Sequence, residues 1–197
     1  MSVRIILSVL GGILLGYYFS PEYILTNTDI IIDIGLCILL FFVGIDIGKN
    51  KEVLSRIKKM GFKILLIPLM IIIGSITGSM LAGLIIDLPI NESGAVGAGL
   101  GWYTLSAMML ANYSSELSTL AFLTNVVREI IALITIPLIA KYIGDLESIA
   151  PAGATAMDTA LPMISRSTNP KTAIISFITG VILSTSVPIL VPIIINI

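Results

Sequence analysis

The sequence predicts an all-α polytopic membrane protein with about five full transmembrane helices and two discontinuous segments, forming a single transmembrane domain over residues 1–197. Of the 197 residues, 56% are hydrophobic and only 12% are charged, whereas a soluble domain carries about 25% charged residues. Apolar runs of about 20 residues, which suffice to cross a bilayer, recur along the chain. The net charge of −1 gives no broad basic surface for nucleic acid, so we expect lipid to surround the protein.

The apolar runs and the basic residues together predict the orientation of the chain in the membrane. Six of the eleven basic residues lie between Lys49 and Lys63, and short loops dense in Lys and Arg stay in the cytoplasm. The N-terminus is therefore expected on the cytoplasmic side of the inner (cytoplasmic) membrane. The expected full spans are residues 2–19, 29–48, 62–86, 117–140 and 171–197.

Two further stretches, residues 94–111 and 150–166, are predicted to form discontinuous or re-entrant segments. The first is rich in glycine, and each glycine inside a helix costs about 1 kcal/mol relative to alanine. The connector 112–116 contains no basic residue, so the positive-inside rule favours two re-entrant segments entering from opposite faces over a complete crossing by 94–111. Such segments are either buried in protein or line an aqueous cavity, and they form the midplane binding sites of secondary transporters.

Three polar residues stand near the middle of the span 117–140: Asn125, Arg128 and Glu129. Charged residues at this depth cost several kcal/mol on insertion scales, so they are usually functional. Asn125 and Glu129 share a helix face because they are four residues apart. One interpretation is a structural ion pair between Arg128 and Glu129 or another acid. The other is that Glu129 binds a proton or a cation in a water-filled cavity, with Arg128 tuning it.

Asp158 lies in the middle of the second discontinuous segment, among small and hydroxyl-bearing residues. Gly153, Thr155 and Thr159 flank it, and unwound carbonyls, threonine hydroxyls and a carboxylate can together form an oxygen cage for an ammonium group or a sodium ion. The alternative is that Asp158 only caps the start of a half-helix.

Two more carboxylates fall within the predicted span 29–48. Asp33 lies near its outer end and Asp46 lies beside the basic loop. Both are candidates for proton or substrate binding inside the membrane. Asp46 has a simpler alternative, which is contact with Lys49 or Lys51 at the interface.

The first discontinuous segment carries an aromatic pair, Trp102 and Tyr103, directly after Gly99 and Gly101. Aromatic rings attract alkylammonium and guanidinium groups, so the pair could form the wall of a cation site, to which Ser106 adds a hydroxyl. Tryptophan and tyrosine are also common anchors at the membrane interface, so an anchoring role for this pair is the alternative interpretation.

Signals for an enzyme or a metal site are poor. The chain has no histidine and one cysteine, and it lacks the GxSxG, HExxH, CxxC and P-loop patterns. We therefore expect a secondary transporter that is not an enzyme and needs no cofactor and no resident metal. Protons are the expected coupling ion, and sodium is the alternative.

Four strings in this order, GLGWYTLSAMML, LAFLTNVVREIIALITIPLIA, GATAMDTALPMISR and VILSTSVPILVPIII, resemble the LysO family of bacterial lysine exporters. The resemblance runs over nearly the whole chain. It implies export of L-lysine, and of related basic amino acids, by proton antiport. It also implies that Glu129 is the family's intramembrane glutamate and Asp158 its broken-segment aspartate. A sodium-coupled carrier of another solute is the alternative function.

The resemblance also bears on partners, because longer family members carry further spans before the region that this chain matches. We therefore expect either a homo-oligomer or a small, separately encoded membrane subunit, without which the chain would be inactive. Small-residue faces at Gly11–Gly16 and Gly74–Gly83 allow helices to approach closely and favour an oligomer.

Overall fold

The computed structural model describes residues 62–197 continuously and, before them, positions 11, 14–18, 30, 34, 38 and 41. The chain divides into two compact units, Met1–Phe41 and Phe42–Ile197. In the first unit the described positions are helical, and the rings of Tyr17 and Tyr18 meet edge to face at 4.9 Å. Asp33, Asp46 and most of the basic loop lie outside the described residues, so the predictions made for them stay predictions.

Three long helices of the second unit are apolar enough to cross a membrane: α5 (Leu66–Ile85), α8 (Ser115–Tyr142) and α10 (Pro170–Ile195). They confirm the spans expected at 62–86, 117–140 and 171–197. The hydroxyl of Ser114 accepts hydrogen bonds from two free N–H groups at the start of α8. Asn169 caps α10 in the same way, followed by a proline at the first position of the helix. Residues 62–197 contain no β-strand, as the all-α prediction requires.

The first discontinuous segment consists of two short helices, α6 (Ile90–Gly97) and α7 (Tyr103–Ala111), with a break between them. At the break Leu100 has a φ of 49° and Gly101 a φ of 97°, which interrupts both helices. The segment begins before the predicted start at residue 94. Its polar residues Asn91 and Glu92 resemble a connector in the sequence, yet they form the first turn of α6, where polar and acidic side chains suit the free N–H groups.

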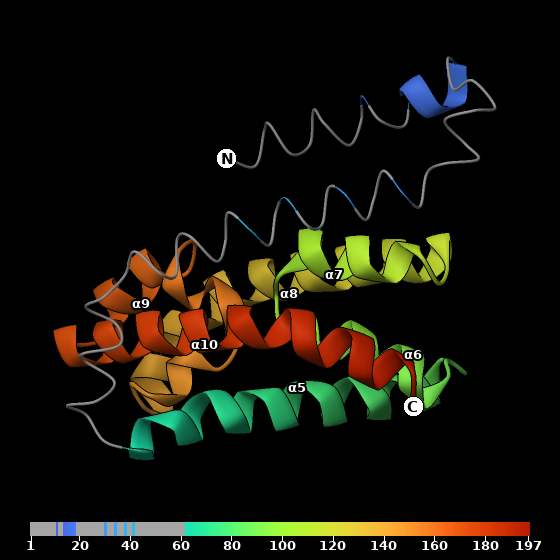
Figure 1. The fold of residues 1–197 in the computed structure, drawn as a ribbon. Helices are drawn as coiled ribbons and strands as arrows, with labels where there is room; N and C mark the ends of the chain where they lie inside the picture. Colours follow the sequence, from blue (N-terminus) through green and yellow to red (C-terminus); the bar gives the residue numbers. More distant parts are fainter. Residues whose placement is uncertain are drawn as a thin grey trace. The chain divides into compact units, whose positions relative to one another are not determined.

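This first segment returns to the end of the bundle from which it enters. The side chain of Asn91, in the first turn of α6, donates a hydrogen bond of 3.1 Å to the carbonyl of Ile195 in the last turn of α10. After α7, the hydroxyl of Tyr113 accepts one of 3.0 Å from Asn196. Both ends of the segment therefore lie beside the end of α10, and Figure 1 shows α6 and α7 extending toward that end.

The second discontinuous segment contains two 3-10 turns, η2 (Glu147–Ile149) and η3 (Gly153–Met157), and the short helix α9 (Leu161–Ser167). Asn169, just before α10, donates a hydrogen bond to the carboxylate of Asp145, just after α8. The segment thus starts and finishes where α10 begins, and α9 lies at that end in Figure 1. The two segments enter from opposite ends of the bundle, as predicted.

The tips of the two segments meet backbone against backbone. The N–H of Ala154 donates a hydrogen bond of 2.8 Å to the carbonyl of Leu100. Gly153, with a φ of 61°, lies so close to that carbonyl that a Cβ atom would collide with it. A Cβ on Gly101 would come within 3.2 Å of the carbonyl oxygen of Ala152. Glycines therefore stand at the two positions where the segments cross.

Helix α10 covers the crossing from one side. Its Gly180 lies against the backbone of Met157, and a Cβ there would overlap the Met157 backbone nitrogen. Four residues earlier, the hydroxyl of Ser176 donates a hydrogen bond of 2.7 Å to the carbonyl of Ala156. The last turn of η3 is thus held by a small residue and a hydroxyl on one helix face, a pattern typical of helix packing in membranes.

Candidate functional site

Asn125 of α8 holds the break in the first re-entrant segment. Its side chain is only 2% exposed. The Oδ1 atom accepts a hydrogen bond of 2.7 Å from the N–H of Gly101, and Nδ2 donates one of 2.9 Å to the carbonyl of Ala121. Gly99 packs so closely that a Cβ atom would lie 2.6 Å from Nδ2. The amide that the sequence places on the same face as Glu129 therefore supports the broken backbone.

The first segment carries three more candidate residues, Ser106, Tyr103 and Trp102, and each makes its own contacts. Ser106 is fully buried, and its hydroxyl donates a hydrogen bond of 2.9 Å to the carbonyl of Trp102 within its own helix. The Tyr103 ring packs edge to face on Phe122 of α8, with 5.4 Å between the ring centres. Trp102, at the N-terminus of α7, is half-buried. The aromatic pair is therefore located where the first segment meets α8.

The two predicted carboxylates, Glu129 and Asp158, belong to α8 and to the end of η3. Glu129 is half-buried on α8, and Asp158 is exposed after η3. The Oδ1 atom of Asp158 accepts a hydrogen bond of 2.6 Å from the backbone N–H of Thr159 and lies 3.3 Å from its hydroxyl. Helix α8 and the second segment, which Arg128 joins through Pro151, thus each carry an acid, which suits a cationic ligand or protons.

The predicted oxygen cage around Asp158 forms only in part. Thr159 contributes its hydroxyl, but the buried Thr155 donates a hydrogen bond of 2.8 Å to the carbonyl of Ala152 in its own turn. Gly153 serves the close approach to Leu100 described above. Within the described part of the chain, no three histidine, cysteine, aspartate or glutamate side chains gather as a metal site would need.

Arg128 does not form the ion pair with Glu129 that the sequence offers as one interpretation. Adjacent helical residues do not face each other, so the two side chains diverge. Instead Nε donates to the carbonyl of Pro151 at 3.1 Å, one terminal nitrogen donates to the hydroxyl of Ser75 at 2.7 Å, and the other approaches the carbonyl of Ala150 at 3.4 Å. No acidic side chain of residues 62–197 pairs with the guanidinium.

Ser75 extends the contacts of Arg128 to the first re-entrant segment. Its hydroxyl donates a hydrogen bond of 2.8 Å to the carbonyl of Gly97, at the end of α6. The guanidinium therefore contacts the second segment directly and the first segment through one serine. Sequence reasoning assigned Ser75 only to a small-residue packing face. A hydroxyl facing a half-buried arginine cannot be recognised without the fold.

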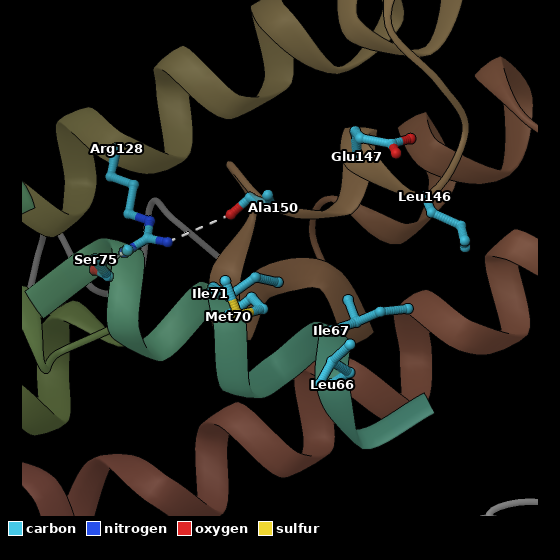
Figure 2. A pocket seen from close by; sticks show the side chains of 10 residues that line it. Leu66, Ile67, Met70, Ile71, Ser75, Arg128, Leu146, Glu147 and Ala150 are labelled. Carbon is cyan, nitrogen blue, oxygen red and sulfur yellow. Dashed lines mark hydrogen bonds between the residues drawn. The ribbon is translucent and has the colours of Figure 1, made fainter. Parts of the chain in front are cut away.

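A cavity of about 760 Å³ lies beside Arg128, between α5, α8 and the start of η2. Figure 2 shows Arg128 and Ser75 together at one end, and Leu66, Ile67 and Leu146 at the other. Met70 and Ile71 form an apolar wall between them, and Glu147 is the acidic residue of the lining. Glu147 is exposed, and no pattern in the sequence singles it out. Its place at a cavity was missed.

Comparisons with known proteins identify relatives of this sequence. A family model described as "Lysine exporter LysO" matches residues 6–195. The Escherichia coli (strain K12) protein "Lysine exporter LysO" is 32% identical over 157 residues, which are 79% of this chain and 52% of that protein. The chain thus spans about half the length of this relative.

A second relative is matched over a larger share of its own length. The Haemophilus influenzae protein "Putative lysine exporter" is 32% identical over 160 residues, covering 79% of both chains. No solved structure matches the chain. Three apolar helices long enough to span agree with a multi-pass membrane protein. Because the family model covers residues 6–195, this chain belongs to the lysine exporter LysO family, a family of transporters rather than enzymes.

Proposed function

We propose that the protein exports L-lysine, and related basic amino acids, from the cytoplasm across the inner membrane in exchange for protons. Glu129 and Asp158 hold protons in one state and the cationic substrate in the other. Tyr103, whose ring packs on Phe122 of α8, forms the wall of this site together with Trp102. Two carboxylates suit the substrate because lysine carries a net positive charge.

The observation that carries this proposal is the crossing of the two re-entrant segments. Asp158 directly follows η3 of the second segment, and Glu129 is next to Arg128, which binds the carbonyl of Pro151. Secondary transporters bind substrate and coupling ion near the midplane, where discontinuous helices present unpaired backbone groups. Irregular backbone at this depth is tolerated only inside protein or along a cavity. The family match supports lysine as the substrate.

The position of the cavity agrees with loading of substrate from the cytoplasm, and the family match supports export as the direction. It is lined by the first turns of α5, which directly follow the cluster of basic residues between 49 and 63. Such clusters usually stay in the cytoplasm, so this end of the bundle is expected on the cytoplasmic side, from which an exporter takes up its substrate.

The decisive test is flux of radiolabelled L-lysine in proteoliposomes that contain the full chain. A pH gradient should drive lysine against its concentration gradient, and Glu129→Gln should reduce this flux to the background of empty liposomes. Glu116→Gln is the matched control, because Glu116 is exposed in the first turn of the same helix. Wild-type protein that moves no lysine, or Glu129→Gln protein that moves it normally, would contradict the proposal.

The same liposomes separate protons from sodium as the coupling ion. The carboxylate and hydroxyl oxygens at Asp158 and Thr159 are also of the kind that sodium binds. Proton antiport predicts that a sodium gradient alone drives no lysine flux. Flux that follows the sodium gradient and ignores the pH gradient would replace this mechanism by a sodium-coupled one.

We also propose that the working unit is larger than one chain, as a homo-oligomer or with a separate small membrane subunit. Gly78 of α5 has no described atom within 4 Å of its added Cβ position, and such small-residue faces permit close helix contact. The mass of the detergent-solubilised protein should exceed that of one chain. A strictly monomeric protein with full transport would contradict this arrangement.

A further inference from the structure

The cavity beside Arg128 is distinct from the Glu129–Asp158 region, since neither acid lines it. It presents a guanidinium, an apolar wall and one carboxylate. We infer that this cavity is a loading site in which Arg128 binds the α-carboxylate of an amino acid and Glu147 attracts its cationic end. The inference rests on the proposed export function and adds to it a site and a chemical group that this site recognises.

The hydrogen bonds of Arg128 leave room for an anionic ligand. A guanidinium has five N–H groups, and three hydrogen bonds are formed here, all to uncharged oxygens. The contact to Ala150, at 3.4 Å, is the longest of them, beyond the usual range for a strong hydrogen bond. A carboxylate would occupy the free N–H groups, and arginine suits it because it can bind both carboxylate oxygens at once.

The positive charge of Arg128 also favours an anionic ligand in the cavity. Within residues 62–197 no carboxylate pairs with it, although it lies within a helix long and apolar enough to span the membrane. An arginine at membrane depth is costly and usually pairs with an anion or lines a substrate path. A substrate that carries its own carboxylate supplies the missing counter-charge whenever the cavity is filled.

The rest of the lining matches an amino acid with a long basic side chain. Figure 2 shows Arg128 and Glu147 on different sides of the cavity, with Met70, Ile71 and Ile67 along the wall below them. This arrangement of cation, apolar wall and anion complements a ligand with a carboxylate, a methylene chain and an ammonium group. A volume of about 760 Å³ lies in the range of small-molecule sites.

Three ligands test the site on the wild-type protein: L-lysine, L-lysinamide, which replaces the carboxylate with a neutral amide, and L-norleucine, which lacks the side-chain ammonium. Each competes with radiolabelled lysine for binding to the purified full chain. We expect lysinamide to bind at least about tenfold more weakly than lysine, the usual size of one lost charge-assisted interaction. Norleucine should bind more weakly than lysine as well, because it lacks the group that Glu147 attracts.

Two variants assign the two ends of the ligand. In Arg128→Gln, lysine should bind as weakly as lysinamide does, so the difference between the two ligands disappears. In Glu147→Gln, lysine should lose its advantage over norleucine. Lys141→Gln is the control, because it removes a charge from the exposed end of the same helix as Arg128 and should preserve all three affinities.

The outcomes separate this inference from the export proposal. Wild-type protein that binds lysine and lysinamide equally overturns the carboxylate site while lysine export stands. Equal binding of lysine and norleucine in wild type, or a Glu147→Gln protein that keeps the difference between them, overturns the role of Glu147. Wild-type protein that binds no lysine overturns both proposals. If Arg128→Gln fails to fold, the three ligands measured on wild type and on Glu147→Gln still decide whether the cavity binds the carboxylate and the ammonium group.

Discussion

The two re-entrant segments are similar in outline and different in chemistry. The first has two regular helices around a short break, and a neutral amide, Asn125, holds that break. The second has 3-10 turns, and a charged guanidinium, Arg128, contacts its carbonyls. The first is largely buried, whereas the second exposes a carboxylate at Asp158. We propose from this comparison that the first segment is a fixed wall and that the second presents the groups that meet substrate or protons.

The largest expected effect comes from removing the carboxylate of the second segment. Asp158→Asn should reduce lysine flux in proteoliposomes to background, because an amide cannot exchange a proton. The protein should still fold, since the amide oxygen can accept the hydrogen bond from the N–H of Thr159. Flux and thermal unfolding measured on one preparation test both expectations.

The matched control lies on the first segment. Glu92→Gln removes its acid, in the first turn of α6, and should leave flux close to that of wild type. Equal losses of flux in the Asp158 and Glu92 variants would contradict the distinction between the first segment as a fixed wall and the second as the segment that meets substrate or protons.

The next effect concerns the crossing itself, which both segments share. Gly153→Ala should strongly destabilise the protein, because a Cβ atom would collide with the carbonyl of Leu100. The left-handed backbone, with a φ of 61°, adds about 1–3 kcal/mol for a residue other than glycine. Thermal unfolding in detergent should show a large loss or no folded protein.

Ser165→Ala in α9 is the control for this crossing, because Ser165 is exposed on a helix of the second segment. It should unfold near the wild-type temperature, since alanine favours a helix. A Gly153→Ala protein as stable as the Ser165 variant would show that the segments do not need this close contact.

Much of this architecture can be predicted from the sequence. Low charge and long apolar runs predict membrane spans, and the glycines of residues 94–111 predict the first interruption. The absence of basic residues at 112–116 correctly favours re-entry over crossing. These signals are local, or they depend on which side of a membrane a loop prefers.

Contacts between distant side chains could not be predicted in the same way. The pattern places Asn125 and Glu129 on one face, but it cannot show that the amide binds the backbone of Gly101. Arg128 next to Glu129 suggests an ion pair, and only the fold reveals acceptors from α5 and from residues 150–151. Ser75 and Glu147 look ordinary in sequence because their importance comes from what packs beside them.

A third prediction tests the support of the first segment. Asn125→Leu should cost about 1–3 kcal/mol, because it leaves the buried N–H of Gly101 without its acceptor. Hydrogen exchange should then increase at residues 98–102 and stay unchanged at 147–151, where Arg128 still binds. Equal acceleration in both segments would mean that they open as one unit, and the comparison between them would lose its basis.

The smallest effect is expected from Ser75→Ala, which removes the link between Arg128 and the first segment. A single hydrogen bond contributes about 0.5–1.5 kcal/mol, and the variant loses one to the carbonyl of Gly97 and one from Arg128. The guanidinium keeps its contacts to Pro151 and Ala150, so the second segment should be unaffected. Exchange should therefore increase near Gly97 alone. Increased exchange at 150–151 would instead show that Ser75 positions Arg128 for both segments, and that the two segments are coupled through one hydroxyl.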